Sequence, residues 1–163
     1  MYIDIRTKEG REKMEVYKHQ YHQKKKDPYV VVSGYFDPIH KGHIEYIAKA
    51  KELGLVILIL NTDEQAIIKK GKPFMKFEDR LAVTEALRNV FIVVPSIDTD
   101  GTVCETLRFL EPDYFAKGGD RFATEIPEAK VCQELGIQMV DGLGQKIQSS
   151  SWIVADSKLM PDC

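Results

Sequence analysis

The sequence VVVSGYFDPIHKGH, residues 30–43, decides the fold. It opens with a β-branched apolar run of the kind that is buried on both faces of a sheet. It then turns at Gly34 and enters a predicted helix through Gly42. A strand that ends at a helix N-terminus makes a site for anions, because orphan backbone N–H groups and the helix dipole both point there. His40 and His43 add protonatable hydrogen-bond donors at that point, so the stretch indicates phosphate or nucleotide chemistry.

Apolar runs and helical patterns alternate along the rest of the chain. Strands are predicted at 29–33, 55–60, 91–94, 114–116 and 137–140. Helices are predicted at 44–53, 62–68, 77–89 and 102–110, at 127–135 between Pro127 and Gly136, and from the serines at 149–151. This order predicts an α/β fold: a doubly wound, Rossmann-like, five-stranded parallel sheet with helices on both faces.

Size and composition restrict the class of protein. The 163 residues suit one domain, which we expect at 29–163, preceded by a charged arm or helix at 1–28. That segment is interpreted as a surface helix, or as an arm that caps the domain or a partner subunit. A net charge of −2 argues against a nucleic-acid partner, because the chain has no general basic field. Three widely spaced cysteines and the lack of a membrane-length apolar run favour a cytoplasmic protein with reduced thiols and no membrane contact.

Three polar clusters follow predicted strands. They are His40 with His43, the run Lys117-Gly118-Gly119-Asp120, and the serines at 149–151. In a parallel sheet all three gather at one edge, where ligands of such folds bind. A zinc site formed by Asp37, His40 and His43 is the alternative for the first cluster, although no fourth ligand lies nearby in the sequence.

The run Gly34 to His43 resembles the GxFDxxHxGH motif of the nucleotidyltransferase superfamily that includes the cytidylyltransferases. The likeness extends over residues 29–156, through Asn61-Thr62-Asp63, the Glu78-Asp79-Arg80 helix start, the Lys117 run and the late serines. Within the superfamily, residues 70–73 and 112–120 look most like the adenylyltransferase domain of heptose-phosphate enzymes, and next like glycerol-3-phosphate cytidylyltransferase.

The resemblance implies transfer of a nucleoside monophosphate from ATP or CTP to a phosphorylated small molecule, with pyrophosphate released by direct in-line attack. It implies His40, His43 and Lys117 as catalytic residues. It implies nucleotide contacts from Gly34, Tyr35, Phe36, Asp37, Gly42, Gly119, Asp120, Ser149, Ser150 and Ser151, and phosphate or acceptor contacts from Lys51 and Arg80. It also implies Mg²⁺ carried on the triphosphate, with Asp120 as a candidate ligand.

The sequence leaves three points open. They are whether the donor is ATP or CTP, which molecule is the acceptor, and whether the protein forms a homodimer. A catalytically silent nucleotide-binding sensor of the same fold is the alternative to an enzyme, and the intact histidines and serines argue against it.

Overall fold

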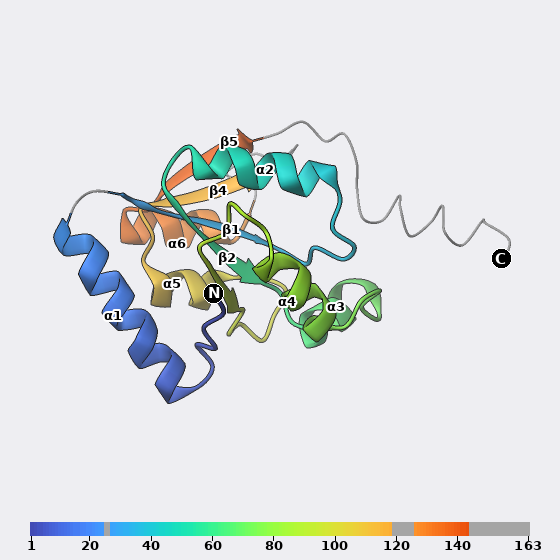
Figure 1. The fold of residues 1–163 in the computed structure, drawn as a ribbon. Helices are drawn as coiled ribbons and strands as arrows, with labels where there is room; N and C mark the ends of the chain where they lie inside the picture. The colour runs from blue at the N-terminus through green and yellow to red at the C-terminus, as the bar shows by residue number, and fades with distance from the viewer. Residues whose placement is uncertain (25–26, 119–125, 144–163) are drawn as a thin grey trace, which may run out of the picture.

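The computed structural model describes residues 1–24, 27–118 and 126–143, and confirms the predicted five-stranded parallel sheet (Figure 1). The strands are β1 (Tyr29–Gly34), β2 (Leu55–Leu60), β3 (Ile92–Pro95), β4 (Tyr114–Gly118) and β5 (Gln138–Leu143). Their order is β3-β2-β1-β4-β5, and every neighbouring pair is parallel. The central strand β1 therefore has β2 on one side and β4 on the other, which makes its carboxyl end the topological switch point.

Helices cover both faces of the sheet. They are α1 (Lys8–Lys24), α2 (Lys41–Lys51), α3 (Asp63–Lys70), α4 (Phe77–Glu85), α5 (Cys104–Leu110) and α6 (Glu128–Leu135). Side chains from α1, α5 and α6 share one core with Val31, Ile57 and Phe115. Side chains from α2 and α4 pack on the opposite face, against Val30 and Ala116. This alternation of β-strand residues between two apolar cores explains why the strands are apolar without interruption.

The first residues of the chain belong to this packed unit. Ile3, Ile5 and Met14 are buried in the core that α1, α5 and α6 cover. Tyr2 forms a parallel bridge with Val93, and Val93 donates its backbone N–H to the Met1 carbonyl, so the start of the chain lies along the edge of β3. The N-terminal segment thus lines a sheet edge and contributes side chains to one core, which goes beyond a surface helix and agrees with the alternative of an arm that caps the domain.

Two helices near the motif differ from their predicted bounds. α2 begins at Lys41, three residues before the predicted start, because the histidines cap it, as described below. α4 ends at Glu85, before the predicted end at residue 89, and it buries Arg80 and Thr84. α3, predicted at 62–68, begins after Thr62, which caps the helix in a reciprocal capping box with Gln65.

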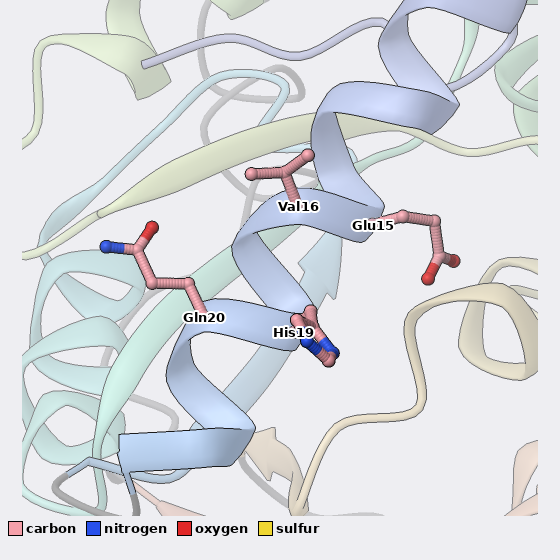
Figure 2. Close-up of a pocket in the computed structure, with 4 residues that line it drawn as sticks. All are labelled: Glu15, Val16, His19 and Gln20. Carbon is pink, nitrogen blue, oxygen red and sulfur yellow. The ribbon is translucent and has the colours of Figure 1, made fainter.

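The described helices include none that is both long enough and apolar enough to cross a membrane. A hollow lies along the exposed side of α1, and Figure 2 shows that it is lined by Glu15, Val16, His19 and Gln20. All four side chains come from one helix, at the opposite end of the molecule from the start of α2 (Figure 1). The hollow therefore contains none of the predicted site residues.

Candidate active site

The turn after β1 places an aromatic ring against one of the two histidines. Phe36 has a positive φ of 51°, a conformation that costs a non-glycine residue of order 1–3 kcal/mol. It directs a buried ring against the His43 imidazole, with the ring centroids 4.8 Å apart. A Cβ at Gly34 would lie 3.2 Å from the same Phe36 ring. A side chain at position 34 would therefore have to displace this ring by a few tenths of an ångström, so glycine suits the point where the chain leaves the sheet.

His40 and His43 cap the first turn of α2. His40 is the N-cap residue, and its Nδ1 accepts from the Gly42 backbone N–H at 3.1 Å. His43, three residues later, accepts from the His40 backbone N–H through its own Nδ1 at 3.2 Å. The two rings stack with their centroids 3.8 Å apart. This is the geometry of a capping box, built here from two imidazoles, and it fixes both rings in place.

The cap decides which protons the histidines carry. A backbone N–H can only donate, so both Nδ1 atoms must be unprotonated, and each neutral ring carries its proton on Nε2. Burial lowers the pKa of His40, and burial together with neighbouring His40 lowers the pKa of His43 to about 3. Near neutral pH both side chains are therefore neutral Nε2–H donors. We expected free backbone N–H groups at this helix start to bind a phosphate. The backbone N–H groups of His40 and Gly42 instead donate to the two imidazoles.

Asp37 holds a neighbouring loop and has little surface to offer a nucleotide. Its side chain is fully buried, and its carboxylate accepts from Lys70 Nζ at 2.6 Å and from the backbone N–H groups of Phe74 and Met75 at 2.8 and 2.6 Å. Asp37 thereby ties the loop after α3 to the turn that precedes His40. We expected Asp37 to contact the nucleotide, and the structure assigns its oxygens to this loop.

Arg80 is a further correction. We expected it to bind a phosphate, yet its side chain is 0% exposed. Its guanidinium donates to the carbonyls of Tyr35 and Asn61, which follow β1 and β2, and to the Met75 carbonyl and the Asp63 carboxylate. A buried guanidinium requires such partners. Arg80 therefore joins the carboxyl ends of two strands from within and presents no surface to a ligand.

The two candidate lysines lie in different surroundings. Lys117 follows Ala116 in β4 at the same sheet edge as the histidines, but its Nζ lies 5.3 Å from the centroid of the Phe115 ring. That ring belongs to the core on the face opposite α2. Lys51 is the exposed last residue of α2, about 15 Å along the helix from its start. That distance separates Lys51 from the histidine pair.

Tyr35 lies beside basic side chains. The Nζ of Lys69 is 4.7 Å and that of Lys70 is 5.6 Å from the centroid of its ring. Its hydroxyl donates to the Gln65 carbonyl at 3.3 Å. Tyr35 therefore connects the turn after β1 to α3, near the loop after α3 that Asp37 holds. The predicted nucleotide contacts Gly119, Asp120, Ser149, Ser150 and Ser151 lie outside the residues that the structure describes.

Metal ligands do not converge within the described part of the chain. No group of three or more His, Cys, Asp or Glu side chains there could hold a metal ion. The zinc alternative fails for a specific reason, because the Asp37 oxygens and both histidine Nδ1 atoms already accept hydrogen bonds. Asp120 lies outside the described residues.

Sequence reasoning missed Lys70 and Tyr46. Lys70, the last residue of α3, completes the Asp37 contact, and its signal in the sequence was its place at the start of residues 70–73, which carry part of the family resemblance. Tyr46 lies one turn after His43, buried, with its hydroxyl bonded to the Ala116 carbonyl. A tyrosine on the buried face of the helix that follows the motif is a detectable signal, since a buried phenol needs a hydrogen-bond partner.

Comparison with known proteins identifies relatives for most of the chain. The family model described as cytidylyltransferase-like matches residues 31–158. Bifunctional protein HldE of Sulfurimonas denitrificans is 36% identical over 117 residues, which are 69% of this chain and 24% of HldE. FAD synthase of Thermococcus kodakarensis is 37% identical over 103 residues, covering 61% of this chain and 68% of the synthase. The chain thus spans about a quarter of the length of HldE and two thirds of the FAD synthase.

A solved structure agrees on the fold. The lipopolysaccharide core biosynthesis protein from Thermoplasma volcanium superposes with a TM-score of 0.62 at 23% identity, covering 72% of this chain and 98% of that chain.

Proposed function

The chain belongs to the cytidylyltransferase-like family of nucleotidyltransferases, and from this premise we propose that it transfers a nucleoside monophosphate from an NTP to a phosphorylated small molecule. An oxygen of the acceptor phosphate attacks the α-phosphorus in line. The bond from that phosphorus to the bridging oxygen breaks, and its electron pair leaves with pyrophosphate. Such a reaction needs chiefly positioning and charge stabilisation from the protein.

The observation that carries this proposal is the histidine cap of α2. Two neutral imidazoles are fixed by backbone N–H groups at the switch point of the sheet, each with its proton on Nε2. The donors are held in position before substrate arrives, so they need no reorganisation as negative charge builds on the α-phosphorus and the leaving group. The N–H bond received at Nδ1 also polarises each ring and strengthens donation from Nε2.

We infer that adenylyl transfer from ATP is the leading form of the reaction. FAD synthase, by its name, makes a dinucleotide in which adenylate is joined to a second phosphate, and this chain is 37% identical to it over 103 residues. The resemblance to heptose-phosphate adenylyltransferase domains points the same way. A sugar phosphate and flavin mononucleotide are accordingly the leading acceptors, and glycerol 3-phosphate with CTP is the alternative.

Mg²⁺ fits this reaction as a cation that arrives with the triphosphate. The described residues hold no cluster of three acidic, histidine or cysteine ligands, and Mg²⁺ bound to phosphates commonly keeps several water ligands and takes one or two carboxylates. When bound, it neutralises triphosphate charge. Asp120 is the candidate protein ligand, and the serines at 149–151 are proposed to contact the β- and γ-phosphates.

Turnover on a panel of substrates tests the proposal. Pyrophosphate release is measured with ATP or CTP against sugar phosphates, glycerol 3-phosphate, phosphocholine and flavin mononucleotide. The proposal expects release that depends on both an NTP and one class of acceptor. Tight NTP binding without release for any acceptor favours the catalytically silent sensor instead.

A further inference from the structure

Two consecutive aromatic rings leave the turn after β1, and they contact different groups. The Phe36 ring packs against the His43 imidazole, with the centroids 4.8 Å apart. The Tyr35 ring lies instead beneath two ammonium groups of α3, with its centroid 4.7 Å from the Nζ of Lys69 and 5.6 Å from that of Lys70. Both distances lie within the range of a cation–π interaction, in which the face of the ring attracts a positive charge. The turn therefore supports a histidine with one ring and lysine cations with the other.

The far end of the Tyr35 ring is fixed to α3. Its hydroxyl donates to the Gln65 carbonyl at 3.3 Å, one helical turn before Lys69. Gln65 is itself held firmly, because it is 1% exposed and its side-chain amide donates to the carbonyls of Asp100 and Thr102 at 2.8 and 2.9 Å. The ring is thus attached to an anchored turn of the helix, and it offers the Lys69 ammonium a contact surface of fixed position.

The exposed charge on this side of the turn is positive. Asp37 pairs with Lys70 at 2.6 Å, but the Asp37 side chain is 0% exposed whereas that of Lys70 is 33% exposed. The negative charge is therefore buried, while part of the positive charge faces solvent. Lys69 is exposed and adds a second ammonium group beside the ring. Figure 1 shows α3 on the same side of the molecule as the start of α2, so an anion that approaches the turn meets lysine cations as well as histidine donors.

We propose that Tyr35 is a positioning residue that holds the Lys69 ammonium where it contacts a phosphate group of a substrate. This proposal rests on the proposed function. A lysine carries its ammonium on a flexible four-carbon stem, and ordering that stem when an anion binds costs side-chain entropy. A ring that already attracts the ammonium lowers this cost before the substrate arrives. The acceptor and the NTP both carry such phosphates, and the experiment distinguishes the two.

Substitutions at the two positions separate the ring from its hydroxyl and from the lysine. Tyr35→Leu removes the ring face and should raise the KM for one phosphorylated substrate by about 2- to 5-fold, the ratio that an exposed cation–π contact supplies. Tyr35→Phe keeps the ring and should fall between wild type and Tyr35→Leu. Lys69→Gln should raise the same KM by about 10-fold, because it removes a charged donor to the phosphate. In the Lys69→Gln background, Tyr35→Leu should have little further effect, since the ring acts mainly through the nearer ammonium.

Phe109→Leu is the matched control. The Nζ of Lys18 lies 5.3 Å from the centroid of the Phe109 ring, so this variant removes a cation–π contact of the same kind. Both Phe109 and Tyr35 are half-buried. Lys18 belongs to α1, which lies at the opposite end of the molecule from the start of α2 (Figure 1). Phe109→Leu should therefore leave both KM values as in wild type.

The experiment measures the KM for the NTP and the KM for the acceptor separately, in variants that circular dichroism shows to be folded. A rise in the acceptor KM places Lys69 on the acceptor phosphate, and a rise in the NTP KM places it on the triphosphate; either supports the proposal. Unchanged KM values in Tyr35→Leu, the same change in Phe109→Leu, or additive effects of Tyr35→Leu and Lys69→Gln overturn it. Absence of both NTP binding and turnover in wild type refutes the proposed function itself.

A second measurement uses the wild-type protein alone. In NMR spectra the ε-methylene protons of Lys69 should resonate upfield of ordinary lysine values, because they lie over the face of the Tyr35 ring. They should shift again when ATP, inorganic pyrophosphate or the acceptor is added. Ordinary resonance positions for Lys69, or no response to any of the three additions, overturn the proposal even if Tyr35→Leu does not fold.

Discussion

Replacing His43 with glutamine should make the protein more resistant to acid. His43 lies three residues after its N-cap residue, at the position where a capping box uses Glu or Gln. The same chain caps α3 in this way, with Gln65 accepting from the Thr62 backbone N–H. Glutamine can therefore replace the Nδ1 acceptor of His43 without introducing a group that titrates.

The expected size follows from the lowered pKa of His43. Its pKa is about 3 in the folded protein, against an ordinary value of 6.5. The unfolded chain therefore binds a proton at His43 below pH 6.5, while the folded protein binds it only near pH 3. The stability associated with the neutral ring is complete above pH 6.5 and is lost as the pH falls toward 3. At pH 4.5 this loss amounts to about 3 kcal/mol relative to neutral pH.

Urea denaturation at pH 7.5 and pH 4.5 measures the effect. Between pH 7.5 and pH 4.5 the free energy of unfolding should fall in both proteins. The fall should be about 2–3 kcal/mol smaller in His43→Gln than in wild type. Tyr29→Phe controls for general destabilisation, because it keeps both histidines and should show the pH dependence of wild type. The same drop in wild type and His43→Gln would refute the reasoning, since the His43 ring would then not be held neutral by its surroundings.

Three other substitutions test individual parts of the site. Lys117→Ala should raise the KM for the NTP or the acceptor, and unchanged kinetics would remove Lys117 from the site. Asp37→Asn should lower the free energy of unfolding by about 2 kcal/mol, since it loses the charge that pairs with Lys70; urea denaturation showing wild-type stability would contradict this account of the loop. Gly34→Ala should lower stability by about 1 kcal/mol and activity more strongly, because its Cβ meets the Phe36 ring beneath His43; wild-type kinetics would count against that support.

The sheet could be predicted because its signal is local and strong. Continuous apolar runs such as Leu55–Leu60 identify buried parallel strands, and Gly136 and Thr62 mark helix ends by their own backbone and capping chemistry. The core role of the N-terminal segment could not be predicted. Its few apolar residues, among them Ile3 and Met14, are scattered among charges, and their partners lie far away in the chain.

Some features of the site could also be predicted from the sequence, and others could not. The motif located the histidines at the switch point, because a strand, a turn and a helix start are readable in sequence. The partners of Asp37 and Arg80 were not readable, because each pairs with residues from another element, Lys70 and Asp63. Charged residues near a phosphate motif suggest ligand contacts. Only the three-dimensional structure shows that these two side chains are buried and already paired with other residues of the protein.

Measurement of kcat and NTP affinity in wild type and His43→Ala side by side tests the role of the histidine donors most directly. The donated Nε2–H bond is expected to strengthen only as charge develops in the transition state, so His43→Ala should lose much of its kcat while its binding of ATP or CTP stays nearly unchanged. Equal losses of affinity and rate, or wild-type turnover in the variant, would contradict it.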